Sequence, residues 1–290
     1  MSLTRRGWLN AALAVMAVAL VMILEHSDKR PHRAAPRRLL AIHAGQITRI
    51  TLARAHHRSM LIVRRGSHWV LKRPFAARAD RFRVESLTDL VRAHVHDRFP
   101  APAALGAFGL APAQARLSVN GTRVLVGRRQ PFGNLRYLLI GHMVALVAAD
   151  TIHPRRLTVD SFLSTRLFGK RVRPIAFALP GLTVARQHGI WRARPLPQHT
   201  SNDRITTFVD EWRYARALSV DRYHGEPVQA HILIRYRVRG NHKGPVRSLT
   251  LGILERRPEL ALVRDDNGLV YHFPAETGER LLSLMRARTS

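Results

Sequence analysis

The sequence MLIVRRGSHW at residues 60–69 has a counterpart, LTVARQHGIW, at residues 182–191. Each segment begins with an apolar run, continues through a basic turn that contains glycine, and ends on a tryptophan. An apolar run on either side of a short glycine-containing turn is typical of a β-hairpin. We therefore predict a hairpin at each position, with Trp69 and Trp191 pointing into a core.

Other parts of the chain match at nearly the same offset, which indicates an internal duplication. The matching positions pair Asp80 with Asp203, Gly127 with Gly252, and Val147 with Val270. A repeat with two copies forms a tandem pair, and each copy needs a small core of its own or a shared one. We predict a first copy at residues 45–170 and a second at residues 171–290.

Each copy is expected to combine antiparallel strands with one helix. Asp80 can cap a helix, and the second helix is expected to begin near Asp203. Apolar side chains follow at helical spacing: Val84, Leu87, Val91 and Val95 in the first helix, and Ile205, Phe208, Val209 and Trp212 in the second. Asn120-Gly121 lies between alternating runs, which is a strong hairpin signal. Residues 232–239 alternate as a strand, and residues 276–288 are expected to form a closing helix. The predicted fold class is α+β.

A long apolar segment stands near the N-terminus. Residues 8–24, WLNAALAVMAVALVMIL, contain no charge and are long enough to cross a bilayer as a helix. No small-residue cleavage site follows directly, which favours an uncleaved anchor over a signal peptide. Arg5 and Arg6 precede the segment. We therefore predict a cytoplasmic tip and anchor at 1–24, a basic proline-rich linker at 25–44, and a periplasmic globular part attached to the inner membrane.

The charge balance is strongly basic. Lysine and arginine number 48 against 19 for aspartate and glutamate, which gives a formal charge of +29. Such a charge favours polyanions, although an arginine-rich composition from a GC-rich genome explains it equally. The chain contains no cysteine, which excludes disulfides and thiolate chemistry.

Several motifs in the first copy resemble a known family. Residues 69–74 read WVLKRP, residues 108–112 read FGLAP, and Val126-Gly127 is followed by Arg136-Tyr137. The chain resembles the bacterial domain-of-unknown-function 4340 family over residues 45–170, and less closely in the second copy. The resemblance implies a membrane-anchored protein with an accessory role beside an ABC-type transporter. It implies no catalytic residues.

Residues with catalytic or metal-binding side chains form no recognisable constellation. Two carboxylate pairs, Glu85 with Asp89 and Asp210 with Glu211, are interpreted as members of solvated ion pairs among arginines. The closest histidine sets, His56-His57 and His94-x-His96, have no third ligand at a useful spacing. Nucleophile and phosphate-binding motifs are absent from the sequence. We predict a non-enzymatic protein without metal or cofactor.

One basic feature has a defined geometry. Arg235, Arg237 and Arg239 alternate, so on one strand all three side chains project from the same face. Such a row suits bidentate binding of phosphates or uronates, and it also suits the solvated face of a half-buried strand. The first functional hypothesis is an envelope scaffold or transporter accessory, and the alternative is a module that binds an acidic polymer, anionic lipid or nucleic acid. The sequence leaves the oligomeric state open.

Overall fold

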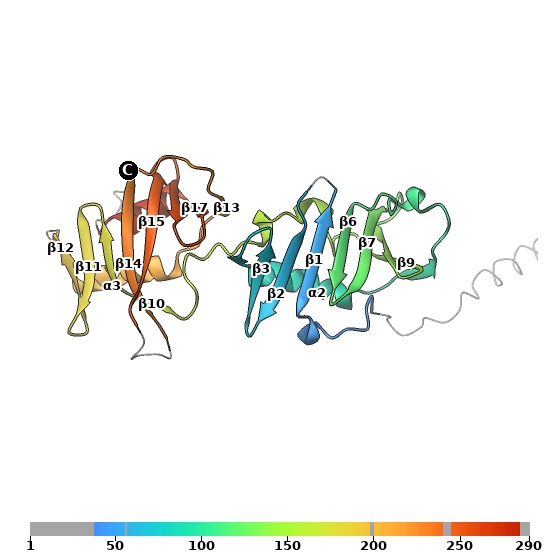
Figure 1. The fold of residues 1–290 in the computed structure, drawn as a ribbon, viewed down its shortest axis with the longest axis horizontal. Helices are drawn as coiled ribbons and strands as arrows, with labels where there is room; N and C mark the ends of the chain where they lie inside the picture. The colour runs from blue at the N-terminus through green and yellow to red at the C-terminus, as the bar shows by residue number, and fades with distance from the viewer. Residues whose placement is uncertain (1–37, 56, 198–199, 240–244, 285–290) are drawn as a thin grey trace, which may run out of the picture.

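In the described part of the chain, two antiparallel sheets of nine and eight strands make up most of the structure, and three short α-helices accompany them. The computed structural model describes residues 38–55, 57–197, 200–239 and 245–284. The predicted α+β class is therefore wrong, and the described chain is mainly β (Figure 1). The sequence pattern correctly indicated a helix in each half, but the strands around it are more numerous than expected.

The first sheet has the strand order β4-β3-β2-β1-β6-β7-β8-β9-β5. Helix α2 (Arg81–Asp89) packs on one face of it. The strands of the first sheet are β1 (Arg49–Arg54), β2 (Met60–Arg65), β3 (His68–Arg73), β4 (Ala77–Arg78), β5 (Asp97–Pro100), β6 (Ala115–Val119), β7 (Thr122–Arg129), β8 (Leu135–Ile140) and β9 (Met143–Ala148).

The second sheet has the strand order β12-β11-β10-β14-β15-β16-β17-β13. Helix α3 (Asn202–Tyr214) packs against β10 and β12, and the C-terminal helix α4 (Ala275–Leu282) packs against α3. The strands of the second sheet are β10 (Val172–Leu179), β11 (Leu182–Gln187), β12 (Ile190–Arg194), β13 (Ser219–Arg222), β14 (Ala230–Val238), β15 (Arg247–Glu255), β16 (Leu260–Arg264) and β17 (Leu269–Phe273).

The two sheets share one topology. In each, a three-stranded meander is followed by a helix, then by a short strand that pairs at the far edge, then by a four-stranded meander. Strands β1, β2 and β3 thus correspond to β10, β11 and β12, and β5 corresponds to β13. The exception is β4, which has no counterpart among the described strands of the second sheet. The copy boundaries at residues 170 and 171 stay a prediction.

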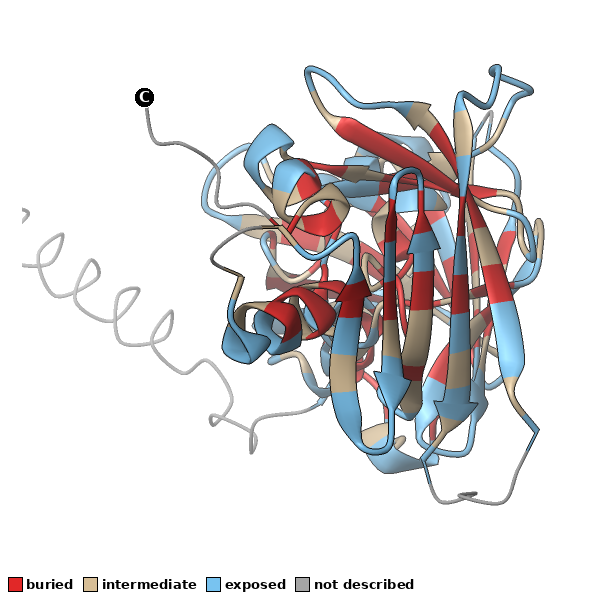
Figure 2. Ribbon diagram, turned by 90° about the vertical axis from the view of Figure 1, so that its left-hand side faces the viewer, coloured by how far each residue is buried: buried red, intermediate tan, exposed pale blue. Residues whose placement is uncertain are grey.

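The hairpins follow from local sequence. Asn120 and Gly121 have positive φ angles of 47° and 95°, and His188 and Gly189 have φ angles of 48° and 86°. Two such residues in succession match the twist of the flanking strands, which gives a tight two-residue turn. Alternation then sets the faces. In β14 the even positions Ile232 and Ile234 are buried and the odd positions are exposed (Figure 2).

The helices begin close to the predicted positions, and the first one ends earlier than its apolar pattern. The Asp80 carboxylate caps α2 by accepting a hydrogen bond from the Arg83 N–H at 3.0 Å. Helix α3 begins at Asn202, close to the predicted start near Asp203, and its cap is Ser201, which accepts a hydrogen bond from the Arg204 N–H at 3.2 Å. Helix α2 ends at Asp89, and a 3₁₀ turn follows it, so the predicted apolar face extends beyond the α-helix. The closing helix was predicted at residues 276–288. In the described residues it is α4, which ends at Leu282.

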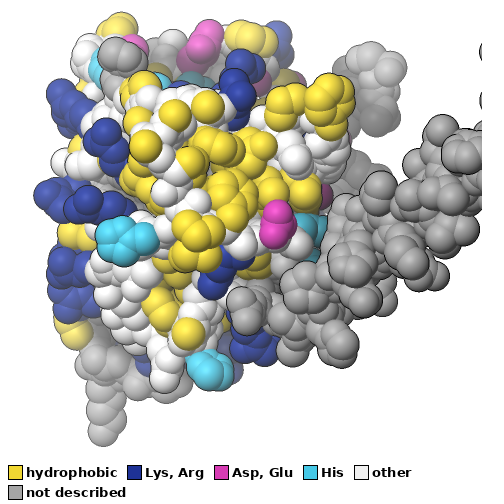
Figure 3. Space-filling model, turned by 90° about the vertical axis from the view of Figure 1, so that its right-hand side faces the viewer, with side chains coloured by type: hydrophobic (Ala, Val, Ile, Leu, Met, Phe, Trp, Pro, Cys, Tyr) yellow, Lys and Arg dark blue, Asp and Glu magenta, His cyan; other side chains and the backbone are white. Residues whose placement is uncertain are grey.

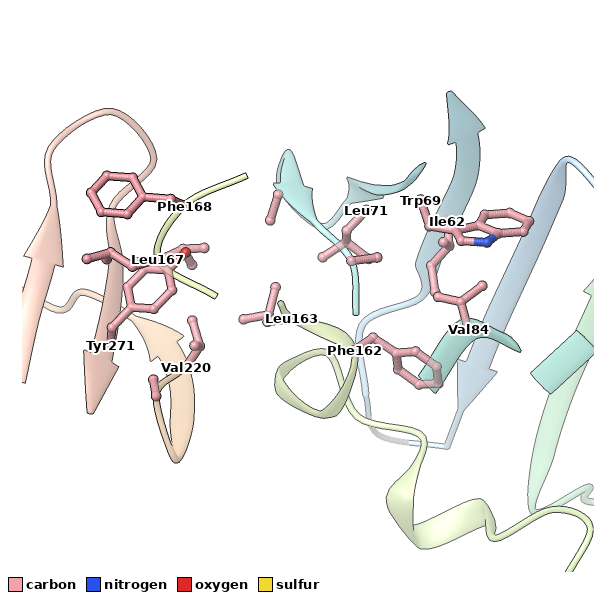
Figure 4. Close-up of a cluster of buried hydrophobic side chains, with 14 of the residues drawn as sticks. Ile62, Trp69, Leu71, Val84, Phe162, Leu163, Leu167, Phe168, Val220 and Tyr271 are labelled. Atoms are coloured by element: carbon pink, nitrogen blue, oxygen red, sulfur yellow. The ribbon is translucent and has the colours of Figure 1, made fainter. Parts of the chain in front are cut away.

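A single hydrophobic core joins the two halves through the connecting residues 149–171 (Figure 4). Phe162 and Leu163 pack on the side of the first sheet, and Leu167 and Phe168 pack on the side of the second. Backbone hydrogen bonds fix the connection, with the Asp80 N–H donating to the Phe162 carbonyl at 2.7 Å. The halves therefore belong to one packed unit.

A crossing segment covers part of the outer face of each sheet, which is the face away from the helix. Residues 101–114 connect β5 to β6 in the first half, and residues 223–229 connect β13 to β14 in the second. Gly127 lies under the first segment beside the Phe108 carbonyl, and Gly252 lies under the second beside Val228. A side chain at either position would collide with its crossing segment, which explains why both halves have glycine there.

The membrane prediction needs correction. None of the helices in the described ranges is long and apolar enough to cross a membrane. This finding contradicts the expected fold of a transmembrane helix followed by two globular copies. The segment that prompted the prediction, residues 8–24, lies outside the described residues.

Candidate anion-binding face

The outer face of β12, β11, β10 and β14 is the strongest candidate site. Helix α3 lies behind these strands in Figure 1, so their outer face is turned toward the reader. The crossing segment 223–229 packs on the outer face of β15 and β16, against Gly252 and Val263. Outward side chains of the four strands are therefore exposed or partly exposed. We call this surface the arginine-bordered face.

Strand pairing aligns two arginines across this face. Arg192 on β12 pairs with Ala185 on β11, Ala185 pairs with Ala176 on β10, and Ala176 pairs with Arg235 on β14. Directly paired residues point to the same side of a sheet. Three strand spacings separate the two arginines, which is roughly 14–15 Å. These four residues form a row across the sheet, with an arginine at each end and two alanines between them as a floor.

The neighbouring row has an arginine at one end only. Arg194 pairs with Thr183, which pairs with Ala178, and Ala178 pairs with Leu233 on β14. Arg237 lies two residues beyond Arg235 on the same face, about 7 Å along the strand. Arginines thus border a floor of small side chains on both sides, and long guanidinium groups can bend over that floor.

The floor between the two borders contains no acidic residue. The sequence has no aspartate or glutamate from residue 161 to 202, nor from 227 to 254. Within the described part of the chain, no hydrogen bond or ion pair holds the side chains of Arg192, Arg194 or Arg235. Their guanidinium groups are exposed and available to an anion, in contrast to Arg264, which pairs with Asp266 at 2.7 Å.

Two of the three arginines in the predicted row lie on one face of a strand, as expected. Arg235 and Arg237 lie on β14 with exposed side chains. Arg239 lies beyond the strand, which ends at Val238, and its backbone N–H donates to the Arg171 carbonyl at 2.6 Å. At this end of the sheet, burial, with Arg213 and Arg239 nearby, lowers the pKa of Arg173.

Sequence reasoning missed the second border of the face. Arg192 and Arg194 alternate in the stretch Trp191-Arg192-Ala193-Arg194, which is the same local signal that singled out the β14 row. What the sequence does not contain is the strand order, because β10 lies between β11 and β14 only in the folded sheet. Trp191 was predicted to be in the core, but it is only partly buried and packs against Phe177 with ring centroids 6.3 Å apart.

A second candidate lies beneath the crossing segment of the second half. A cavity of about 400 Å³ opens there, and its apolar floor includes Leu254, Ala261 and Val270. Its polar lining includes Asp221, His224, Glu226, Glu255 and His272. His272 Nε2 lies 3.3 Å from Asp221 Oδ2, and backbone N–H groups, its own and that of His224, hold the pKa of Glu226 below its ordinary value.

The corresponding region of the first half contains aromatic rings. Phe108 lies 5.9 Å from Phe99 and 4.9 Å from Tyr137 between ring centroids, and Tyr137 is on β8. Figure 3 shows the end of the molecule on the side of the first half, where hydrophobic side chains gather across the centre and lysine and arginine line one border. The two halves therefore share a topology but present different chemistry.

The histidines and carboxylates that the sequence analysis considered make local contacts with neighbouring side chains. The rings of His94 and His96 meet edge to face at 4.9 Å, and the described residues contain no group of three histidine, cysteine or acidic side chains able to hold a metal. Glu85 pairs with Arg81 at 2.6 Å and Asp210 with Arg213 at 3.7 Å, as predicted for ion pairs. His56 lies outside the described residues.

Together, fold and site define a mainly β protein with duplicated topology and one strongly basic sheet face. No family model, no curated protein and no solved structure matches the chain. The resemblance to the domain-of-unknown-function 4340 family therefore stays a prediction, as do the accessory role beside an ABC-type transporter and the absence of enzymatic activity.

Proposed function

We propose that the protein binds an extended acidic polymer on its arginine-bordered face. The observation that carries the proposal is the row in which Arg192 and Arg235 flank Ala185 and Ala176. Guanidinium groups bind carboxylate and phosphate through two parallel hydrogen bonds, which gives both strength and orientation. Small side chains between them let a polymer chain lie close to the sheet.

The spacing of the arginines favours a polymer over a small anion. The backbones of Arg192 and Arg235 lie roughly 14–15 Å apart, so side chains that extend straight away from the sheet hold their guanidinium groups over separate acidic groups. Arg192 and Arg194 on β12, like Arg235 and Arg237 on β14, are spaced about 7 Å along their strand. A chain with regularly repeated acidic groups contacts several of these arginines at once, and linked contacts strengthen one another through effective concentration.

The chemistry of the floor favours an acidic polysaccharide over single-stranded nucleic acid. Proteins that bind single strands stack bases on aromatic side chains. The outward positions of the four described strands carry no phenylalanine, tyrosine or tryptophan. They are Ile190, Arg192 and Arg194 on β12, Thr183, Ala185 and Gln187 on β11, Arg173, Ala176 and Ala178 on β10, and His231, Leu233, Arg235 and Arg237 on β14. Charge recognition without stacking suits a uronate polymer.

The test is binding of fluorescent polygalacturonate to the full chain, followed by anisotropy. The double variant R192Q/R235Q removes one arginine from each border. We expect its affinity to fall about tenfold or more, because each charge-assisted hydrogen bond contributes roughly 1.5–3 kcal/mol before the remaining contacts compensate. Raising the salt concentration should weaken binding of the unaltered protein through screening.

The matched control is R116Q/R123Q, which removes the same charge from exposed positions on β6 and β7 of the first sheet. We expect this variant to bind within about twofold of the unaltered protein, as long-range charge alone contributes little at physiological salt. Equal losses in both double variants would show that net charge, and not the arginine-bordered face, drives binding.

A further inference from the structure

The strands beneath the two crossing segments correspond position by position. The last residue of β5, Pro100, pairs with the first residue of β9, and the last residue of β13, Arg222, pairs with the first residue of β17. The residues that precede these two, Phe99 and Asp221, therefore occupy corresponding positions. An aromatic position of the first half thus holds a carboxylate in the second.

A second aromatic position of the first half carries a small side chain in the second. Tyr137 pairs with the fourth residue of β9, and Ala261 pairs with the fourth residue of β17. In the first half, Phe108 of the crossing segment lies 5.9 Å from Phe99 and 4.9 Å from Tyr137 between ring centroids. In the second half, Asp221 and Ala261 line a cavity of about 400 Å³. Three rings therefore occupy in one half the space that is hollow in the other.

The cavity has the size and the floor of a small-molecule site. Ligand pockets in proteins measure roughly 300–1,000 Å³ and are lined mostly by apolar side chains with a few polar groups. Here Leu254 of β15, Ala261 of β16 and Val270 of β17 form an apolar floor across three neighbouring strands. Such a floor favours the hydrocarbon part of a ligand, because contact with it removes apolar surface from water.

Acidic side chains stand on both sides of this floor. Glu255 is on β15 and Asp221 is on β13, with β16 and β17 between them. Glu226 of the crossing segment also lines the cavity. The chain has only 19 acidic residues against 48 basic ones, so three carboxylates around one cavity give it a charge opposite to that of the protein as a whole. The ligand that suits this lining is a cation.

The other charged groups of the lining do not cancel these carboxylates. Glu226 accepts a hydrogen bond from the His224 backbone N–H at 3.0 Å, and its own backbone N–H together with that of His224 holds its pKa below the ordinary value. It is therefore ionised at neutral pH. Arg222 also lines the cavity, but its guanidinium carbon lies 5.1 Å from the ring centroid of Phe75 in the first half. That guanidinium is already in contact with an aromatic face.

We propose that this cavity binds a linear aliphatic diamine or polyamine, with methylene groups on the apolar floor and an ammonium group toward each acidic side. An ammonium group donates three hydrogen bonds and pairs with carboxylates. Acids on both sides, at Asp221 and Glu255, favour a ligand with a cation at each end. The site differs from the arginine-bordered face in its place, its charge and its ligand, so it does not rest on the binding of an acidic polymer.

The test titrates the full chain with three small molecules that share one carbon chain and differ at its ends. Diaminopentane has an amine at each end, pentylamine has an amine at one end, and pentanediol has none. Binding is followed by the NMR signals of the Ala261 methyl group and the His272 ring, which both line the cavity. We expect diaminopentane to bind at least about fivefold more tightly than pentylamine, because only diaminopentane reaches the acids on both sides.

Two results of this titration would overturn the proposal. Equal affinities for diaminopentane and pentylamine would show that a single ammonium, such as that of a lysine side chain, is sufficient. Signals of Ala261 and His272 that do not move at millimolar diaminopentane would show that the cavity holds no diamine.

Substitutions of the acids test the two sides separately. The variants E255Q and D221N each remove one carboxylate, and we expect each to weaken diaminopentane about fivefold. The matched control is D89N, which removes the same charge from an exposed position at the end of α2 in the first half. It should bind diaminopentane within about twofold of the unaltered protein. Equal losses in D89N and E255Q would overturn the proposal, since net charge would then explain binding.

The variant A261Y gives the second half the tyrosine that the first half has at the corresponding position. We expect the ring to fill the cavity and to abolish diaminopentane binding, with circular dichroism as the check that the variant folds. A folded A261Y protein that binds diaminopentane as tightly as the unaltered chain would contradict the proposal, and E255Q, at an exposed position, tests it independently of this packing change.

The polymer separates this site from the arginine-bordered face. The variant R192Q/R235Q should bind diaminopentane as tightly as the unaltered protein, and E255Q should bind polygalacturonate within about twofold of it. Loss of diaminopentane binding in R192Q/R235Q would overturn the assignment to the cavity, whereas a failure of polygalacturonate to bind would leave the diamine results unaffected.

Discussion

The indole N–H of Trp212 donates a hydrogen bond to the carbonyl of Leu281 at 2.8 Å, and both residues are fully buried. The bond joins α3, which packs on the second sheet, to the C-terminal helix α4. It also gives a hydrogen-bond donor to a backbone carbonyl in the last turn of α4. A buried side chain of α3 thus holds helix α4 in place.

Replacing Trp212 with phenylalanine should destabilise the protein by about 2–4 kcal/mol. The change leaves the Leu281 carbonyl buried without a donor, which costs roughly 1–3 kcal/mol, and it opens a cavity beside Phe177. Urea denaturation followed by circular dichroism measures the difference. The control is W191F, because Trp191 is only partly buried and should cost less than about 1.5 kcal/mol. Similar losses for both variants would contradict the role of the hydrogen bond.

The sequence predicted local structure more successfully than the arrangement of strands. The hairpins at residues 60–69 and 182–191 follow from alternation and turn residues, and both are present. Alternation also placed Arg235 and Arg237 on one face. These features depend on neighbours in the chain, so local periodicity is sufficient to find them.

The candidate face could not be predicted because it depends on pairing between distant strands. Arg192 and Arg235 share a row only because β10 pairs with both β11 and β14. The α+β prediction failed for a related reason, since short strands such as β5 and β13 carry little periodic signal and become strands by pairing at the far edge of each sheet. Gly127 and Gly252 matched in sequence, but their function as contact points for crossing segments required the fold.

Substituting alanine for either of these glycines should destabilise its half of the protein. A Cβ at residue 252 would lie 2.8 Å from Val263 Cγ1 and 2.9 Å from Val228 Cγ1, and such overpacking costs about 1–3 kcal/mol. At residue 127 the collision is with the Phe108 backbone carbonyl, which cannot rotate away, so G127A should cost more than G252A. Thermal unfolding measures both.

The control for these two variants is G45A. A methyl group added at residue 45 would meet no heavy atom within 4 Å, and the backbone there has no positive φ. Alanine at this position should therefore change stability by less than about 0.5 kcal/mol. A G252A protein as stable as G45A would show that the crossing segment 223–229 does not rest on β15 in solution.

Asp160 provides a prediction of pH dependence. Burial, together with the nearby carboxylate of Asp221, raises the pKa of Asp160 above its ordinary value of 3.8. The folded protein therefore holds this proton more tightly than the unfolded chain does, so the stability linked to it is complete below the ordinary pKa and is lost as the pH rises through the raised pKa. At neutral pH the ionised carboxylate weakens the fold slightly.

The variant D160N carries no charge at any pH and should be more stable than the unaltered protein at pH 7. Because the side chain is largely exposed, the gain should be only ~0.3 kcal/mol. The difference should shrink toward zero as the pH falls below 3.8, where the aspartate is protonated in both states. Urea denaturation at a series of pH values measures it, with D150N, in the exposed turn after β9, as the control. A D160N protein that is less stable than the unaltered protein at pH 7, with the deficit disappearing at acidic pH, would contradict this prediction. It would show that the Asp160 carboxylate makes a favourable charged contact.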